Sequence, residues 1–94
     1  MIKFEDLKFE KTFGGVGATH TFDNGISISV QAGSGNYSTP RENLTSSDDF
    51  VSFEIAMWDE DGEWITSNFT GGEDVIGWQD RVEIDELMRE IQNK

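Results

Sequence analysis

The stretch FVSFEIAMWDEDGEW, residues 50–64, decides how this chain folds. Apolar side chains stand at every second position, which is the period of a strand with one buried face. These side chains belong to Val51, Phe53, Ile55 and Met57. Four carboxylates then surround Gly62, where we expect the chain to reverse, and a tryptophan flanks each side of the turn. One segment therefore supplies a core face, an acidic turn and two aromatic rings.

The acidic turn predicts a hairpin with a three-residue loop, residues 60–62, in which Gly62 takes the left-handed conformation. That register predicts four facing pairs, which are Asp59 with Glu63, Trp58 with Trp64, Met57 with Ile65, and Phe53 with Phe69. The odd-numbered apolar residues then share one face of the sheet, and both tryptophans lie on the other. Two acids that face each other are locally unfavourable, so a register chosen for stability alone would not favour that pair.

An earlier segment allows the same reasoning. A two-residue loop at Asn24-Gly25 would place apolar side chains opposite polar ones, whereas a three-residue loop, residues 23–25, keeps one apolar face. Gly25 suits the left-handed position of such a loop. The sequence therefore predicts a bulged hairpin over residues 16–32, with Phe22 facing Ile26, His20 facing Ile28 and Ala18 facing Val30.

The segments around the two hairpins are harder to interpret. Residues 1–13 predict a short strand, and the glycines of residues 14–17 predict a flexible connector. Residues 33–49 predict a long exposed loop. The side chains in it that could anchor it or contact a partner are those of Tyr37, Arg41 and Leu44. Residues 70–79 predict a second connector, in which Val75, Ile76, Gly77 and Trp78 plug the end of the core.

The C-terminal residues predict a helix. Asp80 is a good N-cap, and Glu83 completes a capping box. An apolar stripe follows at helical spacing, formed by Ile84, Leu87, Met88 and Ile91. We therefore expect one domain, residues 1–94, of the α+β class, with an antiparallel sheet of four to five strands and one C-terminal helix packed on one face.

Charge is distributed unevenly along the chain. Residues 1–47 hold five acids and four bases, a net of −1, and residues 48–94 hold fourteen acids and three bases, a net of −11, which together give −12. This field repels nucleic acid and anionic membranes and attracts basic partners. The chain has no cysteine, no apolar signal segment and no apolar run long enough for a membrane span. We expect a soluble protein of the bacterial cytoplasm.

No enzymatic motif is evident. His20 falls on the apolar side of a predicted strand, where a histidine is usually a packing residue, and no G-x-S-x-G context surrounds any serine. A calcium loop that began at Asp59 would need glycine in place of Trp64 and glutamate in place of Thr70. We therefore expect no cofactor. A weak divalent-cation site at the turn and a small enzyme with a cleft around His20 stay open as alternatives.

The acidic half suggests a binding surface. Carboxylates spaced along it could take the place of backbone phosphates in the cationic channel of a nucleic-acid-binding protein, and the tryptophans could supply a buried anchor. The candidate residues are Trp58, Asp59, Glu60, Asp61, Glu63, Trp64, Glu73 and Asp74. The alternative is that the acids form a solvated face and the tryptophans only cover the sheet.

Several blocks resemble a family of small phage and prophage proteins of mostly unassigned function. The blocks are TFDNGISISV (residues 21–30), FEIA (53–56) with DEDG (59–62), and EDVIGW (73–78) before a terminal helix. In the last block Glu73 stands where such proteins commonly have a second aspartate. The resemblance implies a phage origin and no known active site. Small acidic phage proteins include anti-CRISPR and anti-restriction inhibitors, and this analogy of class favours an inhibitor.

These observations lead to one expected function and one alternative. We expect a non-enzymatic, phage-type inhibitor that binds a basic surface of a host protein or ribonucleoprotein, such as a CRISPR effector, and does not bind nucleic acid or membranes directly. The alternative is a structural or accessory phage protein that self-associates through a sheet edge or the tryptophan face.

Overall fold

The computed structural model describes residues 1–70 and 74–94. The five strands are β1 (Glu10–Lys11), β2 (Gly15–Thr21), β3 (Ser27–Gly33), β4 (Phe53–Trp58) and β5 (Ile76–Gln79). The helices are the 3₁₀ turns η1 (Phe4–Asp6) and η2 (Ser47–Asp49), the short α1 (Ser67–Thr70) and the longer α2 (Arg81–Gln92). Among the described residues, no helix combines the length and the apolar character that a membrane span requires.

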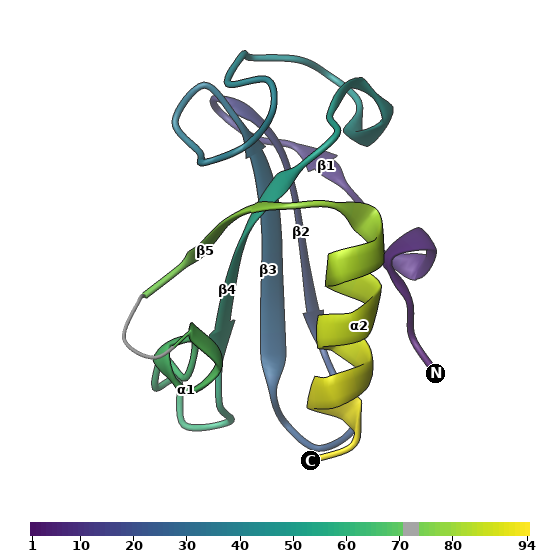
Figure 1. Ribbon diagram of the computed structural model, residues 1–94, viewed down its shortest axis with the longest axis vertical. Coiled ribbons are helices and arrows are strands. Elements are labelled where there is room, and N and C mark those ends of the chain that lie inside the picture. Colours follow the sequence, from purple (N-terminus) through teal and green to yellow (C-terminus); the bar gives the residue numbers. More distant parts are fainter. Residues whose placement is uncertain (71–73) are drawn as a thin grey trace.

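The sheet is an antiparallel meander with the strand order β1-β2-β3-β4-β5, and α2 crosses one of its faces (Figure 1). The core lies between the sheet and α2. Its fully buried side chains from β3 and β4 are Ile28, Val30, Ala32, Phe53, Ile55 and Met57. The α+β class, the antiparallel sheet and the C-terminal helix on one face are thus confirmed.

The β2–β3 hairpin has the predicted register. Ala18 pairs with Val30 and His20 with Ile28. The Phe22 N–H donates to the Ile26 carbonyl over 2.8 Å, which closes the three-residue loop. Gly25 has a φ of 88° within that loop, a conformation that glycine adopts without the steric cost of a Cβ atom.

Helix α2 also begins and packs as predicted. The Glu83 N–H donates to Asp80 Oδ1 over 2.8 Å, and the Asp80 N–H donates to Glu83 Oε1 over 3.1 Å, which is the reciprocal capping box. The buried residues of the helix are the predicted stripe of Ile84, Leu87, Met88 and Ile91.

The strand predicted for residues 1–13 is wrong except at β1. The chain instead follows α2, because side chains of the helix bind its backbone. The Phe4 N–H donates to Asp85 Oδ1 over 2.7 Å, and the Ile2 N–H donates to Gln92 Oε1 over 2.9 Å. Phe4 is buried in the core, whereas Phe13 is fully exposed. Phe4 and Phe9 pack on Phe53 of the sheet, with ring centroids 5.1 Å and 5.7 Å away, without pairing as a strand.

The connector predicted for residues 14–17 is also wrong, because β2 begins at Gly15 and pairs with Gly33. Close approach explains the glycines. A Cβ atom on Gly15 would lie 2.0 Å from the Ala32 carbonyl oxygen, and one on Gly33 would lie 2.2 Å from the Gly14 carbonyl oxygen. The two backbones could not pass so closely with larger residues.

The long loop predicted for residues 33–49 is confirmed apart from its ends. Gly33 is the last residue of β3, and η2 occupies Ser47–Asp49. An isolated bridge joins Thr39 to Ser52, just before β4. The loop therefore crosses the end of the sheet without adding a full strand to it.

The return strand predicted after the acidic turn forms for only a few residues. Trp58 and Trp64 form an isolated antiparallel bridge, and the Ile65 N–H donates to the Met57 carbonyl over 3.0 Å. The Thr66 hydroxyl then bonds to the Met57 N–H and carbonyl, at 2.9 Å and 3.2 Å. The Thr66 side chain thus makes the hydrogen bonds to Met57 that a backbone partner would make in a longer return strand. Helix α1 begins at the next residue. The predicted pair of Phe53 with Phe69 is wrong, because Phe53 pairs with Gln79 of β5.

The connector predicted for residues 70–79 contains this fifth strand. Ile55 pairs with Ile76 and Phe53 with Gln79, so Gly77 and Trp78 together oppose the single residue Glu54. Such a two-to-one pairing is a β-bulge. Ile76 packs against the core as expected, but Trp78 does not plug it, because 55% of its surface is exposed.

Candidate functional site

The acidic turn is held by its own backbone and by one carboxylate. The Asp59 N–H donates to the Glu63 carbonyl over 2.8 Å, and Gly62 has a φ of 83°. Asp59 Oδ1 accepts the N–H groups of Asp61 and Glu63, at 2.9 Å and 3.0 Å. Asp59 is therefore a structural residue of the turn, a role that the sequence analysis missed, although an aspartate at a turn commonly bonds to the backbone that follows. Glu60, Asp61 and Glu63 are left exposed.

The two tryptophans lie together, as predicted. Their ring centroids are 6.3 Å apart and the ring planes are inclined by 40°. Trp58 is partly buried, and 58% of Trp64 is exposed. Both line a concave surface of about 290 Å³ on the sheet face opposite α2, together with Thr19, Ser29, Gln31, Glu54, Ala56 and Val75. Asp59 and Glu63 are the chain neighbours of these two tryptophans, and the carboxylate that lines the hollow itself is that of Glu54.

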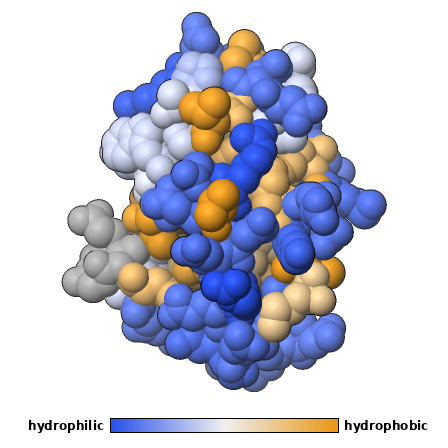
Figure 2. All heavy atoms as spheres, turned by 45° about the vertical axis from the view of Figure 1, so that its right-hand side comes forward, coloured by the Kyte–Doolittle hydropathy of each residue, from blue (hydrophilic) through white to orange (hydrophobic). Residues whose placement is uncertain are grey.

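The acidic turn also contacts the β2–β3 turn. A Cβ atom on Gly25 would lie 3.0 Å from both Cβ and Oε2 of Glu60, so the Glu60 side chain rests against that glycine. Asp23, two residues before Gly25, is exposed and adds a carboxylate to this end of the molecule. Hydrophilic residues cover the same end in Figure 2. No local sequence pattern relates the two turns, so this juxtaposition could not be predicted.

The loop of residues 33–49 is tied to the open sheet face through Glu54. Glu54 Oε2 accepts the Tyr37 N–H over 2.7 Å and Nδ2 of Asn36 over 3.2 Å. Tyr37 stacks on Trp78, with centroids 5.1 Å apart, and the Arg41 guanidinium lies 5.2 Å from the Tyr37 centroid. Tyr37 and Arg41 were expected to anchor the loop or to contact a partner. No pattern in the sequence places Trp78 beside them.

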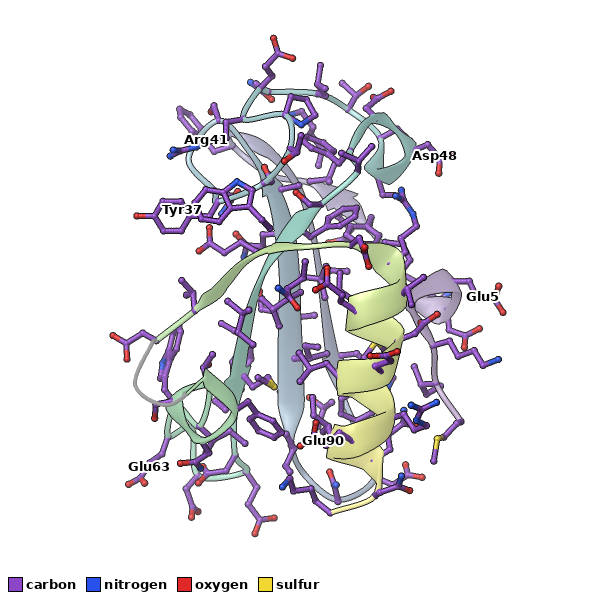
Figure 3. All side chains as sticks on the ribbon, in the orientation of Figure 1. Glu5, Tyr37, Arg41, Asp48, Glu63 and Glu90 are labelled. Atoms are coloured by element: carbon purple, nitrogen blue, oxygen red, sulfur yellow. The ribbon has the colours of Figure 1, made fainter. Side chains whose placement is uncertain are left out.

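The excess acids of the C-terminal half are not gathered into one surface. Figure 3 shows Asp48 and Glu63 at opposite ends of the molecule. Asp80 and Asp85 bind backbone N–H groups of α2 and η1. The structure therefore brings together the six predicted site residues from Trp58 to Trp64. Asp74 is exposed and precedes Val75 of the aromatic hollow, and Glu73 lies outside the described residues.

The two alternatives based on chemistry concern His20 and a cation site. His20 is partly exposed and lies edge-on to Phe22, with centroids 4.9 Å apart. Within residues 1–70 and 74–94, no group of three or more histidine, aspartate and glutamate side chains is placed to hold a metal ion.

Comparison with known proteins finds no family model, no curated protein and no solved structure that matches this chain.

Proposed function

We propose that this chain is a non-enzymatic, phage-type inhibitor that docks its acidic turn and tryptophan hollow onto a cationic surface of a host nucleic-acid-handling defence complex, in the manner of an anti-CRISPR protein. One observation carries the proposal. Glu60, Asp61 and Glu63 are exposed on a turn that Asp59 fixes, and the turn leads directly into Trp64, which is 58% exposed.

This combination supplies both electrostatic attraction and apolar surface that a partner can bury. Carboxylates at the rim attract a basic partner and speed its encounter, whereas they contribute little affinity where water screens them. Tryptophan contributes affinity because its large apolar ring loses water when a partner covers it. A turn with a fixed backbone loses little conformational entropy on binding, so more of the contact energy appears as affinity.

A nucleic-acid-binding protein is the partner class that best fits these charges. Its binding channel is lined with lysine and arginine, which recognise regularly spaced phosphates. The acidic turn presents three exposed carboxylates within four residues, at an end of the molecule that also carries Asp23. The resemblance to small phage proteins favours host defence complexes among the possible nucleic-acid-binding partners. The net charge of −12 disfavours direct binding of this chain to nucleic acid.

Capture of partners from a lysate of infected bacteria tests this proposal. The charge-reversed variant is Glu60→Lys/Asp61→Lys/Glu63→Lys, and the matched control reverses three exposed acids elsewhere, at Glu5, Glu10 and Glu42. We expect the wild type and the control to recover the same nucleic-acid-handling complex, and the charge-reversed turn to lose it. Equal recovery by all three proteins would remove the acidic turn from the interface.

Self-association as a structural or accessory phage protein is the second candidate. The exposed rings of Trp64 and Trp78 favour it, because 58% and 55% of their surfaces face solvent and association would bury them. Sedimentation over a range of concentrations separates the two functions. A stable oligomer that Trp64→Ser dissociates would favour this candidate over the inhibitor.

A further inference from the structure

A groove of about 670 Å³ lies between β5 and α2, and Val75 lines both this groove and the tryptophan hollow. Its volume is in the range typical of binding sites for small molecules and short peptides. The apolar residues Phe69, Ile76 and Leu87 line it, and so does Trp78 of β5, which is 55% exposed. Within residues 1–70 and 74–94, the groove therefore keeps an apolar surface partly open to a partner.

Carboxylates of α2 form the opposite wall of this groove. Glu83, Glu86 and Glu90 all line it, but Glu83 Oε1 is engaged by the Asp80 N–H in the helix cap. Glu86 and Glu90 are exposed, and Figure 3 shows Glu90 on the side of α2 that faces α1. Residues four apart on a helix are separated by roughly 6 Å along its axis. Two negative charges thus follow one wall at a fixed spacing.

Lys94 places an ammonium group against one of the aromatic residues of the groove. The Lys94 ammonium lies 5.0 Å from the ring centroid of Phe69, which is part of the groove lining. Lys94 also borders a shallow depression that Glu86 and Glu90 share with Arg89. A cation near an aromatic face is attracted by the negative potential of the ring, and nearby carboxylates add to that attraction. The groove is therefore suited to a basic side chain.

The wall formed by β5 presents Trp78 in a strained conformation. Trp78 has a φ of 54°, which is uncommon for a bulky residue, and its N–H donates to the Tyr37 carbonyl over 2.9 Å. Bulges at sheet edges can re-aim a side chain, and residues held in such strain cluster at binding sites. Trp78 lines the groove and is 55% exposed, and its ring is packed on one side by Tyr37, with centroids 5.1 Å apart.

We propose that this groove binds a short extended segment of a partner protein in which lysine or arginine alternates with an apolar residue. Residues i and i+2 of an extended chain are roughly 6.6 Å apart and point the same way, which matches the spacing of Glu86 and Glu90. The basic residues then face α2, and the apolar residue between them faces Ile76 and Trp78. An acidic peptide or a nucleic acid would be repelled by the same wall.

NMR titration of the full chain tests this site, because its three tryptophan indole N–H groups report on separate surfaces. Trp58 and Trp64 report on the tryptophan hollow, and Trp78 reports on the groove. The probe is the peptide acetyl-Lys-Leu-Lys-Leu-Lys-amide. We expect saturable shifts of the Trp78 indole and of the Glu86 and Glu90 amides, and weaker binding of pentalysine, which lacks the apolar side chains. Equal affinity for pentalysine, or shifts confined to Trp58 and Trp64, would overturn the proposal.

Two double variants, each with two glutamates changed to glutamine, distinguish local contacts in the groove from the effect of the protein's overall negative charge. The groove pair is Glu86→Gln/Glu90→Gln, and the matched control at the acidic turn is Glu60→Gln/Glu63→Gln. At roughly 0.1 M ionic strength the groove pair should weaken peptide binding about threefold to tenfold, and the control pair should change it less than about twofold. Equal effects of the two pairs would overturn the site. The outcome is independent of the inhibitor function, which rests on the acidic turn.

Discussion

Asp59 and Glu63 are joined twice across the acidic turn. The Asp59 N–H donates to the Glu63 carbonyl over 2.8 Å, and Asp59 Oδ1 accepts the Glu63 N–H over 3.0 Å. Two facing acids are unfavourable in a hairpin because their like charges repel. Here the Asp59 carboxylate accepts backbone N–H groups, which offsets that repulsion. The turn can therefore present its remaining carboxylates on a fixed backbone.

Replacement of Asp59 tests its structural role. Asp59→Ala removes the acceptor of two backbone N–H groups, and we expect the free energy of unfolding to fall by about 1–2 kcal/mol. Asp61→Ala removes a neighbouring exposed carboxylate and should change it by less than about 0.5 kcal/mol. Urea denaturation measures both values. Similar values for the two variants would show that the Asp59 hydrogen bonds do not stabilise the turn.

Two glycines in open space provide a matched test of backbone conformation. An added Cβ atom meets nothing within 4 Å at either Gly62 or Gly35, but Gly62 alone has a positive φ, of 83°. Gly62→Ala should therefore destabilise the fold by about 1–2 kcal/mol through backbone strain. Gly35→Ala should be neutral or stabilise it by up to about 1 kcal/mol. Thermal unfolding would contradict this account if both variants melted at the same temperature.

Arg81 should resist conservative replacement. Its two terminal nitrogens donate to the carbonyls of Phe50 and Ser47, at 2.9 Å and 2.8 Å. The guanidinium also lies 5.1 Å and 5.2 Å from the ring centroids of Phe4 and Phe53. Lysine keeps the charge but cannot form this planar fork, so we expect Arg81→Lys to lose about 1–2 kcal/mol of stability. Wild-type stability of Arg81→Lys in urea denaturation would show that charge alone suffices.

The helix cap gives a fourth prediction. Asp80→Ala removes the side chain that accepts the Glu83 N–H, and about 1 kcal/mol of stability should be lost. For a domain of this size that loss lowers the melting temperature by roughly 4–8 °C. Glu86→Ala, on the exposed side of the same helix, is the control and should leave it nearly unchanged. Calorimetry of the two variants decides whether the cap holds the start of α2.

Local patterns predicted the parts of the fold that depend on local physics. The register of residues 16–32 followed from the requirement that Phe22 and Ile26 share an apolar face, and the helix followed from Asp80 and the apolar stripe. Both are confirmed. The tryptophan pair at the acidic turn was found in the same way, because a three-residue loop permits only one register.

The predictions failed where distant contacts override local pattern. Thr66 ends the return strand by bonding its hydroxyl to Met57, and β5 takes the place beside β4. The N-terminal residues pack against α2 because Asp85 and Gln92 bind their backbone. Trp78 is exposed because it has a left-handed backbone conformation within a bulge. A glycine at this position would have indicated such a conformation, but a tryptophan does not.

Displacement of DNA is the most direct test of the proposed function. A defence complex captured by the wild-type protein is mixed with its target DNA, and the bound DNA is measured by mobility shift in the presence of each protein. We expect the wild type and the control with Glu5, Glu10 and Glu42 reversed to displace the DNA. The variant in which Glu60, Asp61 and Glu63 are changed to lysine should leave it bound. Equal displacement by the charge-reversed turn, or full DNA binding in the presence of bound wild type, would contradict it.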